Sequence, residues 1–323
     1  MTFAGSPDRV ESRLVPEAGF ELDTFAISGL PRRPGLELVR ASLRAALAPV
    51  ACARILKRRR PDVVLGGGGY VAGPMVLAAR LHGIPTALTE ADAHLGLANR
   101  LAAPFARRVF LAYEVPGRRP PKYEVTGRAI PAAHLGADRT AGRERFGLAE
   151  DVPVLAVFGG LAGARALNEF AVDAWGESGP AILHVSGERD FEALRPRVRR
   201  PDYVLLATTN HFGEALAVAD LALSRAGGTV WELAAAGTPA ILVPYPHATA
   251  DHQTLNARHF ERGGGAVVLP QGDLARVPDL VQELLGDGER LRAMSEAMRS
   301  LARPRAADEI ADALVELARS GGR

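Results

Sequence analysis

Residues 224–257 read SRAGGTVWELAAAGTPAILVPYPHATADHQTLNA, and this stretch decides the fold. A glycine turn precedes an expected helix over 230–236, and an apolar strand over 240–243 leads into a polar cluster. Together these segments form a βαβ-like unit. Ligands of a doubly wound sheet bind at the carboxyl ends of its strands, where such loops lie. The stretch therefore predicts a site for a nucleotide-linked group.

Short apolar runs alternate with helical patterns along most of the chain. This alternation favours parallel sheets with crossover helices. We predict an α/β fold of two Rossmann-like doubly wound domains that face a cleft. The expected strands lie at 63–65, 86–88, 109–111, 154–158, 182–185, 204–206, 221–223 and 240–243.

A segment rich in Pro, Gly and charge at 117–136 divides the chain. We assign 1–128 to the first domain and 129–303 to the second. A last helix in 304–323 either ends the second domain or crosses back to the first. Residues 2–4 already read as the end of a strand, whereas a doubly wound domain normally opens with a strand, a glycine-rich loop and a helix. The first domain is thus a variant, or its first unit is absent from this chain.

The composition is that of a globular protein: 323 residues, 47% hydrophobic and 24% charged. The single cysteine, Cys52, excludes an intramolecular disulfide and fits a reducing compartment. The first ten residues lack a signal-peptide pattern. No apolar run reaches the roughly 18 to 20 residues that span a bilayer.

The charge is unevenly distributed. Residues 1–128 hold 19 Lys and Arg against 11 Asp and Glu, whereas residues 129–323 hold 20 against 26. A basic half joined to an acidic half predicts that the first half faces a polyanion. Anionic lipid, nucleic acid and a phosphorylated substrate all qualify.

Two glycine-rich loops follow buried strands. Gly159, Gly160 and Gly163 come after the strand at 154–158 and before a helix, where backbone amides can approach an anion. A tight strand–helix turn explains them equally well, because such glycine patterns are weakly specific. Residues 66–69 are four glycines, which exceeds the need of a turn and favours a close approach to a ligand.

Thr229 and Glu232 form a T-x-x-E pattern, which predicts a capping box at the start of the helix over 230–236. Capping suffices to explain both residues. The functional alternative is that the Glu232 carboxylate accepts two hydrogen bonds from a ribose diol.

A polar cluster follows the strand at 240–243: His247, Asp251, His252, Gln253 and Asn256. A metal site, an acid–base pair and hydroxyl recognition compete as interpretations. The metal reading is weak because the histidines lie in a Pro-containing loop without a neighbouring cysteine. Amide side chains both donate and accept, which suits sugar hydroxyls. A solvated helix start with Asp251 near its cap is the structural alternative.

Residues 36–60 form a long apolar and basic helical stretch, which Pro49 is expected to kink or divide. Such a helix either presents a solvated basic face or lies on an anionic membrane surface. The apolar residues expected to pack inward are Leu38, Val39, Leu43, Leu47 and Val50.

Several blocks in this order resemble the MurG-type transferases of glycosyltransferase family 28. They are PDVVLGGGGYVAGPMVLAARLHGIP (61–85), LTEADAHLGLANRLAAPFARRV (88–109) and FGGLAGARALN (158–168), together with residues 224–257. The resemblance covers essentially the whole chain and implies a GT-B fold.

The implied reaction transfers N-acetylglucosamine from its UDP donor to the muramoyl 4-hydroxyl of undecaprenyl-diphospho-muramoylpentapeptide (lipid I). It gives lipid II and UDP with inversion, and it needs no cofactor and no bound metal. The resemblance also implies a peripheral enzyme on the cytoplasmic face of the membrane, with a UDP-sugar, a lipid-linked acceptor and an anionic membrane surface as partners and no nucleic acid.

Site residues follow from the resemblance by position. Glu232 is implied to bind the ribose, Gln253 and Asn256 to read the sugar, and the glycine turns to approach diphosphate. The implied donor-binding residues are Gly159, Gly160, Gly163, Arg225, Gly227, Gly228, Thr229, Glu232, Gln253 and Asn256. The implied acceptor-binding residues are Gly67, Gly68, Gly69, Tyr70 and Asp92, with Glu90 as a possible catalytic residue.

The chain also departs from the family pattern. The family's H-E-Q-N reads Thr89-Glu90-Ala91-Asp92 here, its phosphate-binding serine is Leu161, and the arginine after N-P-V is Pro131, with Arg128 nearby. The family's opening G-G-T-G-G-H loop, whose histidine is a candidate general base, does not occur. We therefore expect that a segment is missing, from a misplaced start codon or a partial gene.

These departures leave two alternatives open. One is another lipid glycosyltransferase of the same superfamily, such as a diacylglycerol glycosyltransferase. The other is a non-catalytic UDP-sugar-binding chain, or a subunit that a second chain completes.

Overall fold

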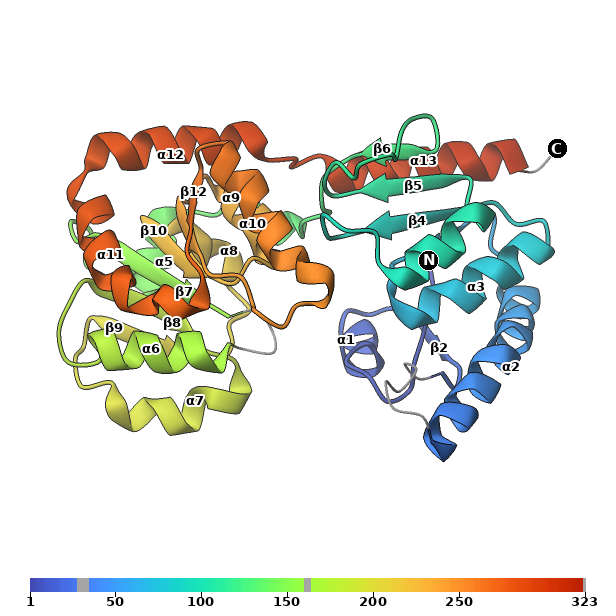
Figure 1. The fold of residues 1–323 in the computed structure, drawn as a ribbon, viewed down its shortest axis with the longest axis horizontal. Helices are drawn as coiled ribbons and strands as arrows, with labels where there is room; N and C mark the ends of the chain where they lie inside the picture. Colours follow the sequence, from blue (N-terminus) through green and yellow to red (C-terminus); the bar gives the residue numbers. More distant parts are fainter. Residues whose placement is uncertain (28–34, 160–163, 322–323) are drawn as a thin grey trace. The chain divides into compact units, whose positions relative to one another are not determined.

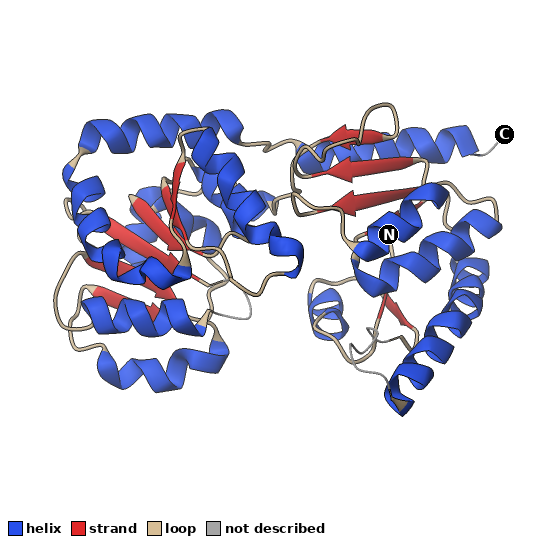
Figure 2. Ribbon diagram, in the orientation of Figure 1, coloured by secondary structure: helices blue, strands red, loops and turns tan. Residues whose placement is uncertain are grey.

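The computed structural model describes residues 1–27, 35–159 and 164–321. The chain forms two compact units (Figure 1). Unit 1 comprises Met1–Thr126 with Asp308–Arg323, and unit 2 comprises Gly127–Ala307. Both units contain parallel sheets with helices between the strands (Figure 2). The predicted α/β class is confirmed.

Unit 2 is built on one six-stranded parallel sheet. Its strands have the order β12-β11-β10-β7-β8-β9, so the first strand of the unit lies beside the fourth. This is the strand order of the Rossmann fold. The strands are β7 (Val154–Phe158), β8 (Ala181–Val185), β9 (Tyr203–Leu206), β10 (Leu221–Ser224), β11 (Ala240–Leu242) and β12 (Ala266–Val268).

Alternate residues of these strands face helices on the two sides of the sheet. Leu155 and Val157 of β7 join a core cluster with α6 and α11, whereas the Phe158 ring contacts Phe212 of α8. All five predicted strands of this unit form because continuous apolar runs fit a sheet that is buried on both faces. The helices are α5 (Arg139–Phe146), α6 (Arg165–Trp175), α7 (Glu188–Leu194), α8 (Phe212–Ala217), α9 (Thr229–Ala236), α10 (His252–Arg262), α11 (Val277–Gly286) and α12 (Gly288–Leu301), with the short η2 (Ala132–His134).

Unit 1 carries its strands in two parallel sheets rather than in one doubly wound sheet. β1 (Phe3–Gly5) pairs only with β2 (Leu22–Thr24). The other sheet has the order β3-β4-β5-β6. Within residues 1–27 and 35–126, no strand joins β1 to β3. The second sheet comprises β3 (Val64–Gly66), β4 (Thr86–Glu90), β5 (Arg108–Leu111) and β6 (Tyr123–Val125), and the helices before it and between its strands are α1 (Glu11–Glu17), α2 (Leu36–Arg59), α3 (Gly69–Leu81) and α4 (Leu97–Ala102).

Helix α2 continues through Pro49, so the expected division of this helix does not occur. Its buried face consists of Ala48, Cys52, Ile55 and Leu56, which pack with α3 in one core cluster. Burial raises the pKa of the Cys52 thiol to about 12, so this cysteine is held as a neutral core residue.

The prediction that Leu43, Leu47 and Val50 pack inward is wrong. These side chains are 60%, 58% and 54% exposed. They lie at i, i+4 and i+7 on a second stripe of the helix, and the smaller Ala48 and Cys52 allow close packing on the other stripe. The side chains of Leu38 and Val39 are outside the described residues.

The last helix, α13 (Ala306–Gly321), belongs to unit 1. Ile310, Ala313 and Leu317 pack against Ala87 of β4 and Phe110 of β5. Its i, i+3, i+7 spacing aligns these three residues on one face. The helix therefore covers one side of the β3–β6 sheet, as Figure 1 shows.

This packing predicts that Leu317→Ala destabilises unit 1 by about 3 kcal/mol, because it removes a buried side chain and leaves a cavity. Denaturation in urea, followed by circular dichroism, measures the loss. Val315 lies on the same helix and is 47% exposed, so Val315→Ala is the matched control and should change stability by less than about 0.5 kcal/mol. Equal effects of the two variants would contradict the assigned packing.

Candidate donor and acceptor sites

The strand order of unit 2 makes β7 and β10 neighbours. The connections after these neighbouring strands lead to different helices, α6 and α9, and both begin at the carboxyl edge of the sheet. This is the topological switch point at which doubly wound sheets bind ligands. The loop after β7 begins at Gly159, and the loop after β10 contains Arg225, Gly227 and Gly228. Gly160 and Gly163 lie outside the described residues.

The predicted capping box at α9 does not form. The helix begins at Thr229, its N-cap is Gly228, and no side chain caps it. Gly228 already has helical φ and ψ angles of −61° and −31°, which moves the start one residue earlier than the T-x-x-E pattern assumed. Thr229 is therefore the first helical residue, and Glu232 is free of a capping role.

Glu232 instead bonds to a residue that the sequence analysis did not single out. Its Oε1 atom lies 2.8 Å from Nδ1 of His134, at the end of η2. The two side chains are 98 residues apart in the chain, so no local pattern could have revealed the pair. Both side chains are only partly exposed.

Arg128 lies against the turn formed by Gly227 and Gly228, which precedes α9. A Cβ atom placed on Gly228 would be 2.3 Å from the Arg128 Cζ atom, so glycine at this position leaves room for the guanidinium. A Cβ on Gly227 would meet nothing within 4 Å. A cation thus lies beside the N-terminus of α9, where the helix dipole also favours an anion.

Arg225 is buried behind the same turn. Its guanidinium donates to the carbonyl oxygens of Val243 and Pro244 at 3.1 and 3.3 Å and to Oε1 of Gln271 at 2.6 Å. Tyr245 lies beneath it, with 5.6 Å between its ring centroid and Cζ. In this structure Arg225 therefore holds the loop after β11, and its contact with a donor stays a prediction.

Gln253 and Asn256 also make local contacts on α10. Oε1 of Gln253 accepts a hydrogen bond from the Tyr245 amide at 2.9 Å, and Nδ2 of the buried Asn256 donates to the Ala226 carbonyl at 3.1 Å. Asn256 thereby fixes the residue that precedes the glycine turn. That these two amides read the sugar stays a prediction.

A buried polar network joins α6 to β8. His184 Nε2 donates to Oδ1 of Asn168 at 3.0 Å, and Nδ1 accepts from the Tyr203 hydroxyl at 2.9 Å. Nδ2 of Asn168 donates in turn to Asp190 at 3.0 Å. Burial lowers the pKa of His184 to about 3, so the imidazole is neutral and the network has one consistent set of donors and acceptors.

The neutral His184 predicts a pH-dependent stability. The unfolded chain takes up a proton near pH 6.5 that the folded protein does not, so His184 should lower the unfolding free energy by about 1.4 kcal/mol for each pH unit below 6.5. His184→Gln should flatten this slope between pH 6.5 and 5, as measured by urea denaturation. His211→Gln, at an exposed histidine, is the control and should keep the slope. An unchanged slope in His184→Gln would refute the assignment.

Unit 1 contains a hollow of about 340 Å³ at the carboxyl ends of β3 and β4. Gly67, Gly68 and Gly69 line it together with the loop from Glu90 to Asn99. Gly68 and Gly69 have φ angles of 87° and 67°, which a residue with a side chain rarely adopts. The turn thus brings the N-terminus of α3 to the hollow without Cβ atoms in the way.

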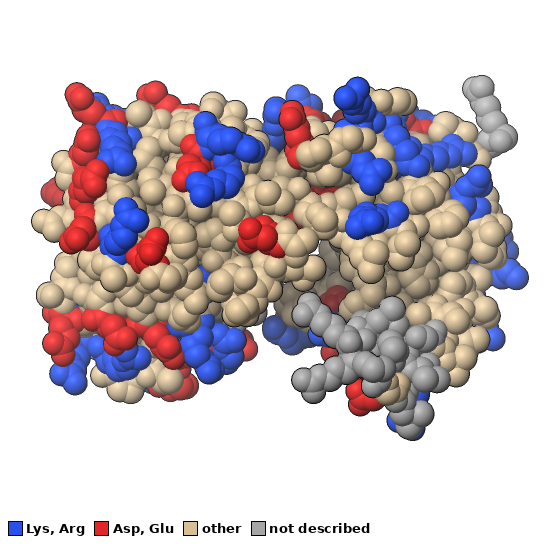
Figure 3. Space-filling view, in the orientation of Figure 1, with Lys and Arg blue, Asp and Glu red and all other residues tan. Residues whose placement is uncertain are grey.

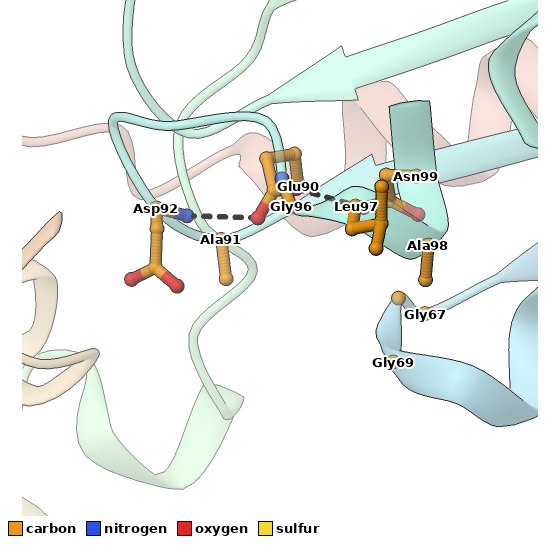
Figure 4. A pocket seen from close by; sticks show the side chains of 10 residues that line it. Gly67, Gly69, Glu90, Ala91, Asp92, Gly96, Leu97, Ala98 and Asn99 are labelled. Carbon is orange, nitrogen blue, oxygen red and sulfur yellow. Dashed lines mark hydrogen bonds between the residues drawn. The ribbon is translucent and has the colours of Figure 1, made fainter. Parts of the chain in front are cut away.

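Glu90 organises the opposite wall of this hollow. Its carboxylate accepts hydrogen bonds from the amides of Asp92 (3.3 Å) and Gly96 (2.9 Å) and from Nδ2 of Asn99 (2.9 Å). Figure 4 shows the Asp92 carboxylate directed away from Glu90. With three donors on it, Glu90 fixes the wall of the pocket, and its catalytic role stays a prediction.

Tyr70 points to another partner. Its hydroxyl accepts a hydrogen bond from Nε of Arg9 at 2.9 Å, and Tyr70 is not among the residues that line the hollow. Its acceptor contact stays a prediction.

Among the described residues, no group of three or more His, Cys, Asp or Glu side chains could hold a metal ion.

The fold and the loops at its strand ends define a nucleotide-sugar glycosyltransferase of the GT-B class. Residues 2–111 match the glycosyltransferase family 28 N-terminal domain, and residues 154–310 match the glycosyltransferase family 28 C-terminal domain. The chain belongs to glycosyltransferase family 28.

Individual relatives agree with this assignment. The chain is 40% identical, over 99% of its length and 96% of the relative's, to the UDP-N-acetylglucosamine–N-acetylmuramyl-(pentapeptide) pyrophosphoryl-undecaprenol N-acetylglucosamine transferase of Rubrobacter xylanophilus. It is 41% identical to the transferase of the same name from Acidithiobacillus ferrooxidans, over 98% and 90% of the two chains. The crystal structure of Acinetobacter baumannii MurG superposes on this chain with a TM-score of 0.76 at 29% sequence identity. The match covers 98% of this chain and 90% of the MurG chain.

Proposed function

We propose that this protein transfers N-acetylglucosamine from UDP-N-acetylglucosamine to the muramoyl 4-hydroxyl of lipid I and so forms lipid II. The observation that carries the proposal is the identity of 40% with a transferase of that activity along nearly the full length of both chains. Both family 28 domains are matched, so donor and acceptor halves are covered.

The donor half supplies the groups that a nucleoside diphosphate needs. Glu232 would accept the ribose hydroxyls, and the turn at Gly227 and Gly228 would let the diphosphate approach the amides of α9. As the acceptor oxygen bonds to the anomeric carbon, the bond from that carbon to the diphosphate breaks and UDP leaves with the electron pair. Arg128 and the N-terminus of α9 would stabilise the charge that develops on UDP.

The acceptor half would bind the diphosphate of the lipid-linked substrate. The Gly67–Gly69 turn presents the N-terminus of α3 to the hollow, which Asp92 also lines. A base must take the proton of the attacking hydroxyl. Glu90, which lines the hollow, is the residue to which the family resemblance assigns a possible catalytic role.

The acceptor assay tests the proposed reaction. The purified protein is given UDP-N-acetylglucosamine with either lipid I or diacylglycerol, and products are separated by mass. We expect a disaccharide product with lipid I only, and Glu232→Ala should reduce its formation tenfold or more, because a hydrogen bond to a charged group contributes about 1.5–3 kcal/mol. Transfer only to diacylglycerol would favour the other lipid glycosyltransferase. Binding of UDP without transfer to either acceptor would favour the non-catalytic or split-subunit alternative.

We further propose that unit 1 docks peripherally on an anionic membrane, at its cytoplasmic face, through α2. Arg40, Leu43, Leu47, Val50, Arg54 and Lys57 are spaced by three and four residues alternately, which places them on one exposed stripe. Its middle is apolar and its ends are basic, the pattern of a helix that lies in the lipid interface. Figure 3 shows the Lys and Arg side chains of one face of the molecule in blue. No helix within the described residues is long and apolar enough to cross a membrane.

This surface predicts that Leu43→Gln/Leu47→Gln weakens binding to phosphatidylglycerol vesicles about tenfold or more, since burial of two leucines in lipid is lost. Vesicle sedimentation measures the partitioning. Val315→Gln on α13, at another exposed apolar residue, is the matched control and should bind as the unmodified protein does. Unchanged partitioning of the double variant would exclude α2 as the docking surface.

A further inference from the structure

His134 has a fixed position beside the donor site. It ends η2, and its ring lies against the Phe212 ring of α8, with centroids 5.4 Å apart in an edge-on arrangement. Phe212 in turn contacts Phe158, the last residue of β7, at 5.1 Å. The imidazole is therefore held by packing against Phe212, which itself packs against the last residue of β7.

The backbone of η2 is held equally closely. A Cβ atom on Gly213 would lie 2.5 Å from the Ala133 carbonyl oxygen and 2.9 Å from the His134 Cα atom. The segment can approach α8 this closely only because residue 213 is a glycine. Main chain and ring together leave His134 little freedom relative to α8.

This rigid imidazole contacts one oxygen of a carboxylate. Nδ1 of His134 lies 2.8 Å from Oε1 of Glu232, and since an ionised carboxylate only accepts, Nδ1 donates. A hydrogen bond to a charged acceptor fixes the plane of the carboxylate, which otherwise rotates about its last bond. The side chains are 21% and 17% exposed, so solvent competes little for this contact.

We propose that His134 is a positioning residue of the donor site, which sets the orientation of the Glu232 carboxylate so that it accepts both hydroxyls of the donor ribose. This inference rests on the proposed function, in which Glu232 binds that ribose. The hydrogen bond from His134 uses one lone pair of Oε1. The remaining lone pairs on the two carboxylate oxygens can accept hydrogen bonds from both hydroxyls of a vicinal diol. Because the anchor is set before the donor arrives, the ordering of the carboxylate does not weaken binding.

Two simpler roles of His134 would give other binding results. A purely structural histidine would affect every ligand of unit 2 alike. A histidine that blocks Glu232 would compete with the ribose, and its removal would tighten binding. Only a positioning residue predicts a loss that is confined to ligands with an intact ribose diol.

Calorimetry with UDP and 2′-deoxy-UDP separates these roles. The unmodified protein should bind UDP more tightly than 2′-deoxy-UDP. His134→Ala should weaken UDP binding about tenfold, the loss expected for a hydrogen bond to a charged group, and 2′-deoxy-UDP binding far less. His134→Gln should retain most of the preference, since its amide can donate to Glu232. In a Glu232→Ala background, His134→Ala should have no further effect.

Two controls keep folding and binding apart. Thermal unfolding of each variant reports whether unit 2 is intact, and His211→Ala, at an exposed histidine next to α8, should bind both nucleotides as the unmodified protein does. An unchanged ratio of the two affinities in His134→Ala, equal losses for both nucleotides, or tighter UDP binding would each overturn the positioning role. If the unmodified protein binds neither nucleotide, the proposed function itself fails. If the unmodified protein prefers UDP and His134→Ala keeps that preference, only the positioning role of His134 fails.

Discussion

The donor half depends on the adjacency of β7 and β10 at the centre of the second sheet. Because β7 and β10 are paired in parallel and their connections run to different helices, the segments after both strands begin at the same edge of the sheet. Gly159 and the Arg225–Gly228 segment are placed there by topology alone. Two surrounding side chains then contact this segment: Asn256 donates a hydrogen bond to the Ala226 carbonyl, and the Arg128 guanidinium lies against Gly228.

The sequence predicted the elements well where burial dominates. Continuous apolar runs such as 154–158 and 182–185 are strands within one residue of the expected bounds, because a parallel sheet covered on both faces admits few polar residues. The glycine turns were also placed correctly, since their backbone angles or close contacts exclude side chains at Gly68 and Gly228. These are properties of one segment and its immediate surroundings.

The errors arose where two segments had to be known together. The T-x-x-E pattern predicts a capping box of Thr229 and Glu232, yet the helix already begins at Thr229, and the Glu232 carboxylate bonds to His134 instead. On α2, two apolar stripes compete for the core, and periodicity cannot tell which is buried. The small residues Ala48 and Cys52 decide it, through the close contact that they allow with α3.

Helix α13 gives unit 1 an unusual order of assembly. The β3–β6 sheet is complete by Val125, but the helix that covers Ala87 and Phe110 begins only at Ala306. A ribosome therefore makes the whole of unit 2 while one apolar face of unit 1 is still bare. Unit 1 cannot bury this face until residues 306–321 have been made, and apolar surface that is exposed during folding promotes aggregation. The burial of this face of unit 1 therefore depends on Ile310, Ala313 and Leu317, which follow the whole of unit 2 in the chain.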